Sequence, residues 1–120
     1  MVVYKFVDSA CGMWRSFASW LLPCEIRAQY TLDQVTYPPV IGSRLFAFDS
    51  QEHAEGWLIN REGKALLECE CGSAEVCHYK IPSAAMAGYC WEDGKLLLGR
   101  VDAPEGTVLV DWIKPLKVIW

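Results

Sequence analysis

The chain has 120 residues, which suits one compact domain, residues 1–120, with a single hydrophobic core. Its formal net charge of −4 removes the long-range attraction that a phosphate backbone exerts on a basic protein, so general nucleic-acid binding is excluded. No stretch reaches the about 20 apolar residues of a membrane helix and the N-terminus lacks a signal peptide's apolar segment, so we expect a cytoplasmic protein that does not bind membranes.

The first part of the chain is predicted to contain short strands and one helix. Val2–Val7 alternates weakly and is predicted to be a strand. Apolar residues at helical spacing predict a short amphipathic helix over Ala10–Leu22, with a looped segment as the alternative. Glu25–Tyr30 alternates apolar and polar residues, which is typical of a half-exposed strand. We expect Thr31–Gln34 to turn the chain and Val35–Tyr37 to pair back onto that strand.

Residues Ser43–Trp57 give the clearest local prediction, a strand that runs directly into a helix. Leu45–Phe48 alternates with the period of a strand, and Asp49, followed by Glu52 at the capping-box spacing, indicates a helix N-terminus. We expect this principal helix to run from Ser50 to about Asn60.

The second half of the chain is predicted to be mostly strands. Ala65–Cys71 alternates so that Leu67, Cys69 and Cys71 lie on one face and Glu68 and Glu70 on the other. Asp-Gly and Pro-Glu-Gly turn signals separate further predicted strands, which are Val76–Ile81, Tyr89–Trp91, Leu96–Val101 and Thr107–Ile113. The tail Lys114–Trp120 is predicted to be an edge strand or a docking segment, and a partner subunit is one candidate to cover it.

Together these elements predict the α+β class, with a twisted, mostly antiparallel sheet and one principal helix, about residues 50–60, packed on one face. The aromatic content includes six Trp, more than so small a core holds. Some tryptophans are therefore expected at a groove, a ligand pocket or an oligomer interface.

The six cysteines are many for a cytoplasmic protein. Without an export signal we interpret most of them as small buried apolar residues in reduced form. The alternative is a zinc site formed by Cys69, Cys71, Cys77 and His78. A Cys-x-Cys pair on one strand face separates the thiols by about 7 Å, however, and structural zinc sites mostly use Cys-x2-Cys. Buried core cysteines are the preferred interpretation, and no metal or cofactor is expected.

Catalytic side chains are not indicated strongly at any position. His53 could serve as a general base only beside a nucleophile or a substrate pocket, and an exposed histidine on the helix surface is the simpler interpretation. Glu68 and Glu70 share a strand face and could form an acid–base pair, but a solvated sheet face is the preferred interpretation.

Arginines among aromatic residues indicate a different chemistry. The guanidinium fork binds phosphate in a bidentate manner and an aromatic ring can stack on a base. Arg44 and Arg100 each adjoin the end of a predicted strand, and Tyr89 or Trp91 would supply a stacking platform. The alternative for each arginine is a solvated or ion-paired side chain.

Three segments, Tyr30–Val35, Leu45–Ala54 and Pro104–Leu116, resemble a family of small uncharacterised phage-encoded proteins. More loosely, the chain resembles the phage anti-defence sponges of the Thoeris type, which sequester a cyclic ADP-ribose or cyclic oligonucleotide signal. That resemblance implies a homo-oligomer in the host cytoplasm that binds its ligand without turnover.

The leading functional hypothesis is therefore non-enzymatic sequestration of a small nucleotide-type ligand by Arg44, Arg100 and Tyr89 or Trp91. The first alternative is a protein-binding inhibitor that masks a host defence enzyme through exposed tryptophans and acidic charge. The second alternative is a small enzyme that modifies nucleotides or proteins, with His53 or a glutamate at the base of a cleft.

Overall fold

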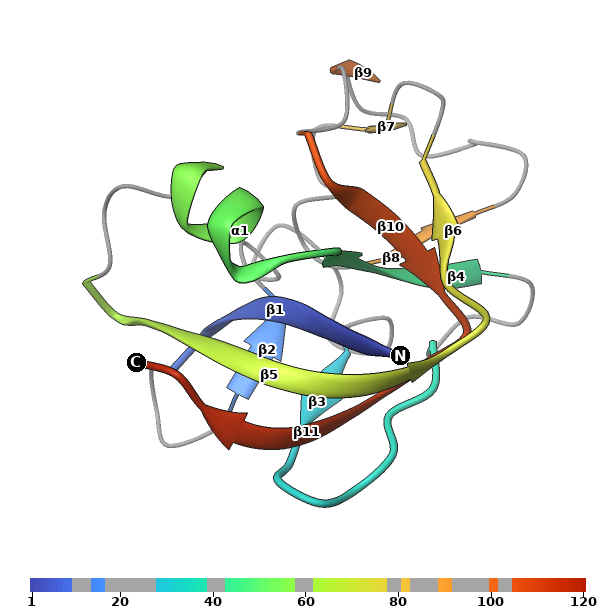
Figure 1. Cartoon of the computed structure of the whole chain (residues 1–120). Helices are drawn as coiled ribbons and strands as arrows, with labels where there is room; N and C mark the ends of the chain where they lie inside the picture. The colour runs from blue at the N-terminus through green and yellow to red at the C-terminus, as the bar shows by residue number, and fades with distance from the viewer. Residues whose placement is uncertain are drawn as a thin grey trace.

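The computed structural model describes residues 1–9, 14–16, 28–38, 43–57, 62–77, 81–82, 89–91, 100–101 and 105–120. Strands dominate these residues (Figure 1). The described elements are β1 (Val2–Asp8), β2 (Trp14–Ser16), β3 (Gln29–Tyr30), β4 (Ser43–Phe48), α1 (Gln51–Trp57), β5 (Lys64–Gly72), β6 (Glu75–Val76), β7 (Ile81–Pro82), β8 (Tyr89–Trp91), β9 (Arg100–Val101), β10 (Thr107–Val110) and β11 (Trp112–Val118).

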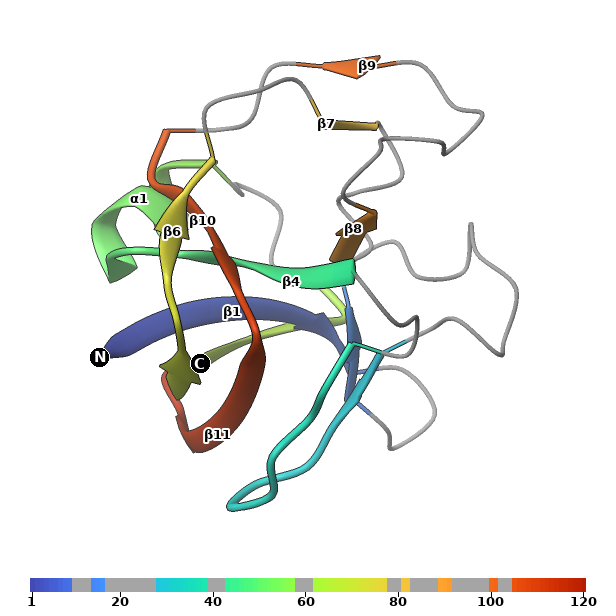
Figure 2. The ribbon, with the colours of Figure 1, turned by 90° about the vertical axis from the view of Figure 1, so that its right-hand side faces the viewer.

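The main sheet follows the order β11-β5-β1-β4-β10-β6, with β2, β3 and β8 attached at its sides. Every pair of strands in the described residues is antiparallel. Only Asp111 separates β10 from β11, although the two strands lie near opposite ends of this order. The sheet therefore curls round on itself (Figures 1 and 2), and the Asp111 N–H fixes the corner by donating to the Gly72 carbonyl at 2.9 Å.

The inside of the curled sheet holds the larger hydrophobic core. Alternation along each strand sends one set of side chains inward, and the pattern predicted for residues 65–71 is confirmed, since Leu67, Cys69 and Cys71 are buried. Burying such side chains stabilises each by about 1.5–3 kcal/mol. The buried members of this core are Val3, Val7, Ala28, Tyr30, Leu45, Ala47, Ala65, Leu67, Cys69, Cys71, Val108, Val110 and Ile113.

A second apolar cluster lies on the outer face of the sheet, where α1 and the end of the chain meet it. Ala54 of α1 is fully buried with Phe6, Phe48 and Leu66. The Trp57 ring lies 6.2 Å from that of Phe6 and 5.5 Å from that of Phe48. The strand-to-helix unit and the class of a mostly antiparallel sheet with a helix are thus confirmed, while residues 58–60 of the predicted helix lie outside the described residues.

The C-terminal tail also packs on this outer cluster. β11 is paired with β5 and lies at the sheet edge, as predicted for an edge strand. Beyond it, the Ile119 N–H donates to the Leu66 carbonyl and the Leu66 N–H donates to the Trp120 carbonyl, at 2.7 and 2.8 Å. The Trp120 ring lies 5.5 Å from that of Phe6. Much of the apolar tail is therefore explained by contacts within its own chain.

Two predictions of local structure are wrong in the described residues. Trp14–Ser16 forms β2, which pairs with β1 and β3, so the helix predicted over 10–22 does not hold there. Trp14 packs partly buried against the inner core. The predicted strand 107–113 is broken at Asp111, because the chain changes its hydrogen-bonding partner from β4 to β5 at that corner. The strand predicted over 96–101 is described only at Arg100–Val101.

The segment after β3 turns as predicted but pairs with a different strand. Asp33 adopts a positive φ of 61°, and the Gln34 N–H donates to the Thr31 carbonyl at 3.2 Å. Thr36 then exchanges backbone hydrogen bonds with Ile113 of β11, at 2.7 and 3.0 Å. No helix in the described part of the chain is long and apolar enough to cross a membrane.

Gly72 and Gly56 give opposite expectations for the same substitution. Gly72 lies opposite Trp112 in the β5–β11 pair, and a Cβ atom there would overlap the indole ring. Gly72→Ala is expected to lower the free energy of unfolding by about 1–3 kcal/mol, as overpacking does. At Gly56 in α1 a Cβ meets nothing within 4 Å, so Gly56→Ala should raise it by about 0.5–1 kcal/mol. Urea denaturation of both variants checks the signs, and equal changes would contradict this packing.

Candidate functional site

Three of the four predicted ligand-binding residues lie on neighbouring strands. β8 pairs with β4 so that Cys90 stands opposite Arg44, Tyr89 opposite Leu45 and Trp91 opposite Ser43. Arg100 lies in β9, which pairs with β7 in a separate two-stranded sheet. Of these four residues only Arg44 has a described side chain. The backbone thus brings Arg44, Tyr89 and Trp91 together but leaves Arg100 in another sheet.

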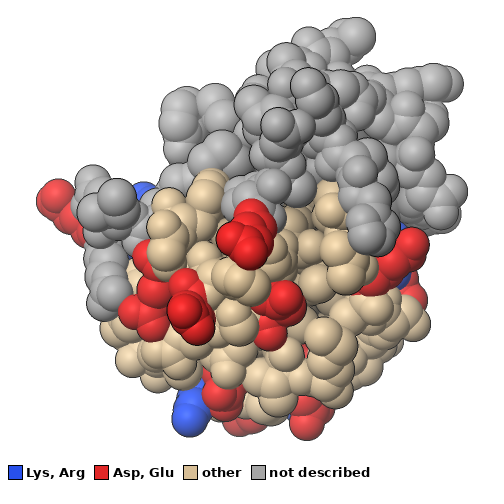
Figure 3. All heavy atoms as spheres, turned by 45° about the horizontal axis from the view of Figure 1, so that its top comes forward, with Lys and Arg blue, Asp and Glu red and all other residues tan. Residues whose placement is uncertain are grey.

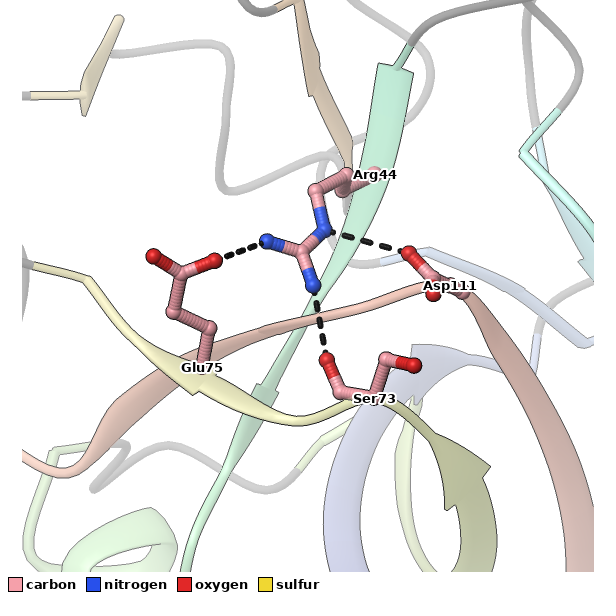
Figure 4. Close-up of polar contacts among 4 residues, drawn as sticks. All are labelled: Arg44, Ser73, Glu75 and Asp111. Carbon is pink, nitrogen blue, oxygen red and sulfur yellow. Dashed lines mark hydrogen bonds and ion pairs between the residues drawn. The ribbon is translucent and has the colours of Figure 1, made fainter.

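The Arg44 guanidinium binds groups from two other parts of the chain (Figure 4). Its Nη1 donates to Glu75 Oε2 at 2.6 Å and its Nη2 donates to the Ser73 carbonyl at 2.7 Å. Its Nε lies 3.3 Å from Asp111 Oδ1, an ion-pair contact at the β10–β11 corner. Burial lowers the pKa of Arg44, but the hydrogen bond to Glu75 and the charges of Asp111 and Glu75 outweigh it and raise that pKa. Arg44 therefore fastens β4 to β6 and to the corner that closes the sheet.

Arg44→Ala is expected to lower the free energy of unfolding by about 1–2 kcal/mol, because it removes charge-assisted hydrogen bonds. The expected loss of stability is small because the Glu75 and Asp111 side chains are 66% and 52% exposed, and water screens their charges. Lys117→Ala, at a side chain 63% exposed and 3.7 Å from Glu68, is the matched control and should change stability by less than about 0.5 kcal/mol. Thermal unfolding of both variants measures the difference. Equal unfolding midpoints for Arg44→Ala and Lys117→Ala would show that the contacts of Arg44 do not stabilise the fold.

His53 is held between carboxylates at the start of α1. Its Nδ1 lies 2.6 Å from Asp49 Oδ1, and its Nε2 lies 3.7 Å from Glu105 Oε1. The hydrogen bond to Asp49 raises the pKa of His53, desolvation acts against it, and the charges of Asp49, Glu105 and Glu52 add to the rise. An imidazole oriented by a carboxylate has the form of a general base. Its contact with Asp49 lies at the start of the helix, however, and its contact with Glu105 links α1 to the turn before β10, so both have a structural role.

The helix cap differs from the prediction by one residue. The Ser50 hydroxyl accepts the hydrogen bond of the His53 N–H at 3.1 Å, which makes Ser50 the N-cap, and Asp49 pairs with His53 instead. The Asp49 N–H donates to the Gly106 carbonyl at 2.8 Å. Gly106 has a φ of 85°, and a Cβ there would overlap the His53 ring. Glycine is thus needed where the turn meets the helix.

Lys5 is the functional candidate that the sequence reasoning missed. Its side chain is 5% exposed and points to the inside of the sheet, between the inward-facing Val3 and Val7. Its Nζ donates to the Phe46 carbonyl at 2.6 Å and lies 5.8 Å from the centre of the Tyr30 ring. The alternation of β1 could have indicated this burial, because Lys5 lies on the same face of the strand as Val3 and Val7.

Burial gives Lys5 unusual acid–base chemistry. Desolvation lowers its pKa from 10.5 to about 7, although the Cys69 thiol acts in the opposite direction. Burial in turn raises the pKa of Cys69 to about 12, so that thiol stays neutral near pH 7. Lys5 is consequently a buried amine whose charge changes near neutral pH.

The cysteines and glutamates of β5 lie on opposite faces of the strand. Cys69 and Cys71 are free and buried, and Cys77 is free and partly exposed. Among the residues that the structure describes, no group of three acidic, cysteine or histidine side chains is placed to hold a metal ion; His78 lies outside them. Glu68 accepts a hydrogen bond from the Tyr4 hydroxyl at 3.5 Å and lies 3.7 Å from Lys117 Nζ. The solvated-face interpretation of Glu68 thus agrees with its surroundings.

The loop after β3 carries the densest group of exposed apolar side chains in the described residues. Leu32, Val35 and Tyr37 are 40%, 43% and 67% exposed. The loop projects from the curled sheet (Figure 2), yet the Asp33 N–H donates to the Pro115 carbonyl at 2.8 Å and Thr36 is bonded to Ile113. Exposed apolar side chains thus stand on an ordered backbone. The four tryptophans with described side chains are all partly buried, unlike the exposed tryptophans that the protein-binding hypothesis required.

A different surface of the molecule is acidic. With the upper side of Figure 1 turned forward, carboxylates lie over the described part of the face, and Lys or Arg show only at its margins (Figure 3). Asp49, Glu52 and Glu105 are exposed, and their charges act on His53. The acidic surface disfavours anionic ligands there.

Comparisons of this chain with models of protein families, with curated proteins and with solved structures found no match.

Proposed function

We propose that this chain acts by binding another protein, without catalysis, and that the loop of residues 31–37 is its contact surface. The observation that carries the proposal is the group of exposed apolar side chains Leu32, Val35 and Tyr37 on one ordered loop. Apolar residues scattered singly on a surface are ordinary, but a local group of them marks an interaction site. In this function the chain would mask a surface of its partner.

The anchoring of the loop supports this choice. Hydrogen bonds from Asp33 and Thr36 to β11, and from the Thr36 hydroxyl to the Gln29 carbonyl at 2.8 Å, hold the backbone at both ends. A contact loop that is already ordered loses less conformational entropy on binding. Tyr37 is the most exposed of the three, and tyrosine is enriched among the residues that dominate binding energies.

The chemistry of the partner follows from the loop and the net charge. The loop would fill an apolar pocket, because its exposed side chains are two aliphatic residues and one tyrosine. With a chain charge of −4, a basic rim around that pocket would speed association and favour the correct orientation. The partner is therefore expected to be a protein with an apolar pocket bordered by Lys or Arg.

Site-specific photocrosslinking tests the contact surface. A photoreactive phenylalanine analogue replaces Tyr37 in one variant and Val76, which is 57% exposed on β6, in the matched control. Irradiation in a lysate of the producing cell should give one discrete adduct from position 37 and none of that mass from position 76. Equal adducts from both positions, or none from position 37, would rule the loop out as the contact surface.

Sequestration of a nucleotide-type ligand is the second candidate, and one observation favours it. The β4–β8 register places the backbone of Tyr89 and Trp91 on the strand beside Arg44, with Cys90 directly opposite Arg44. The resemblance to phage sponges would require stacking and anion-binding residues in one pocket. A phosphate would have to displace Glu75 and Asp111 from the Arg44 guanidinium, which weakens this candidate.

Calorimetry against cyclic nucleotides and ADP-ribose isomers tests sequestration. Binding of one ligand, with the intact compound recovered after denaturation, would support a sponge, whereas a converted product would indicate an enzyme. If no ligand in the panel binds, sequestration is ruled out for these ligands. The protein-binding proposal does not depend on that result.

A further inference from the structure

The ladder between β1 and β4 is unusually short. Their only paired residues are Tyr4 and Phe48, whereas β1 is paired with β5 along its whole length, from Val2 to Asp8. Away from that point the two strands take other partners, since the end of β1 pairs with β2 and the start of β4 pairs with β8. Among the described residues, the β1–β4 seam is thus the place where few backbone bonds resist separation.

Side chains bridge this seam on both faces of the sheet. On the outer face the Phe6 ring lies 6.1 Å from that of Phe48, and on the inner face Lys5 makes a hydrogen bond. Lys5 follows Tyr4 on β1, and its Nζ donates to the carbonyl of Phe46 on β4 at 2.6 Å. The interaction is buried, because Lys5 is 5% and Phe46 6% exposed. The seam therefore combines a minimal ladder with a lysine whose nitrogen is removed from water.

The surroundings of Lys5 favour its neutral form. The titratable side chains around it include the Cys69 thiol on β5 and Tyr30 on β3, whose ring centre is 5.8 Å from Nζ. The residue opposite Lys5 on β5 is the fully buried Leu67. A cation in this interior loses its hydration, which lowers the Lys5 pKa to about 7.

We propose that the β1–β4 seam is a proton-sensitive gate, whose closed state favours Lys5 as a neutral amine and whose open state holds Lys5 as a hydrated ammonium. Protonation needs only a proton from solvent and breaks no covalent bond. The open state exposes the Lys5 ammonium, the Phe46 carbonyl and the Tyr30 ring. The gate goes beyond the proposed protein contact and does not depend on it.

The linkage of proton binding to opening gives a quantitative expectation. In the open state Lys5 is hydrated and its pKa returns to its ordinary value of 10.5, while in the closed state it is about 7. Between these values the open state holds a proton that the closed state lacks. The open fraction should therefore rise about tenfold for each unit that the pH falls from 10 to 7, and become constant below 7.

Amide hydrogen exchange measured by NMR at pH 7, 8 and 9 tests the gate. Protection factors of Lys5, Phe46 and Ala47 should fall about fiftyfold between pH 9 and pH 7, while Leu66, bonded to the Trp120 carbonyl, stays more protected at each pH. Equal protection at the seam and at Leu66 would mean that only global unfolding exposes Lys5, and would overturn the gate.

Two variants separate the role of Lys5 from general charge effects. Lys5→Met should make protection at the seam independent of pH, whereas Lys117→Met, at an exposed lysine of β11, should behave as the wild type does. If Lys5→Met does not fold, titration of the wild-type protein alone tests the gate. The Lys5 side-chain carbon signal should titrate with a midpoint near 7, and a midpoint close to those of the exposed lysines would refute the gate.

Discussion

Lys5→Met is expected to make the protein more stable at pH 7, by about 3 kcal/mol, although it removes a buried hydrogen bond. Lowering the pKa of Lys5 from 10.5 to about 7 corresponds to a cost of about 5 kcal/mol for keeping this amine in the folded interior near pH 7. Methionine avoids that cost, but the Phe46 carbonyl then lacks this donor, which offsets about 1–2 kcal/mol of the gain.

The pH dependence of this effect has a defined sign and window. Between pH 7 and pH 10.5 the unfolded chain binds a proton at Lys5 and the folded chain does not, so the stability of the wild type rises with pH by about 1.4 kcal/mol per unit. The advantage of the methionine variant should therefore be largest at or below pH 7, vanish near pH 9 to 10, and reverse at higher pH, where only the loss of the donor to Phe46 remains. The raised pKa of the Cys69 thiol opposes this trend at high pH in both proteins. Because the Lys5 charge lowers the Cys69 pKa, its removal in the methionine variant strengthens that opposing effect.

Chemical denaturation of both proteins from pH 6 to pH 10 measures this difference. Lys117→Met serves as the control, because its side chain is 63% exposed, and its difference from the wild type should not change with pH in this window. A Lys5→Met variant that is less stable than the wild type at pH 7 would mean that the interior favours the charged amine.

Leu67→Ala is expected to lower the free energy of unfolding by about 2–5 kcal/mol, the usual loss for a leucine truncated in a close-packed core. Leu67 is fully buried inside the curled sheet and stands opposite both Lys5 of β1 and Val118 of β11. Removing it would leave a cavity where three neighbouring strands meet. Such a loss is a large share of the total stability of a small domain.

The matched control for this cavity is Leu32→Ala, at a side chain 40% exposed on the projecting loop. It should change stability by less than about 0.5 kcal/mol. Urea denaturation of the two variants gives both values. Similar losses at the two positions would contradict the placement of Leu67 in the core.

The parts of the fold that local sequence could predict are those whose pattern lies within one element. β4 running into α1 was recognisable from the alternation of Leu45–Phe48 and the polar residues that follow. The inward and outward residues of β5 were recognisable for the same reason. In both strands alternate residues face the inner core and the outer cluster, so the period of two is visible within the element itself.

The wrong predictions concern residues whose structure depends on distant partners. Trp14–Ser16 is a strand because β1 and β3 supply its hydrogen bonds, and helical spacing of apolar residues does not report such pairing. Thr36 pairs with Ile113 rather than with the preceding strand, because the corner at Asp111 brings β11 there. Helix propensity and turn chemistry alone predict neither the pairing of Trp14–Ser16 nor that of Thr36.

The candidate site was predicted even less well, for the same reason. Arg44 was interpreted as an anion donor that folding does not explain, yet it binds Ser73, Glu75 and Asp111, which are remote in the sequence. Lys5 belongs to a strand that was predicted correctly, but its burial is evident only once β3, β4 and β5 surround it. The ordered apolar loop likewise depends on its bonds to β11.

The central claim, that the loop of residues 31–37 binds a protein partner, is tested most directly by the affinity for the partner captured at position 37. Tyr37→Ala should weaken that affinity by about 30-fold or more, the effect of losing about 2 kcal/mol at a dominant contact, while Val76→Ala should leave it unchanged. Equal affinities of the wild type and Tyr37→Ala would contradict the claim.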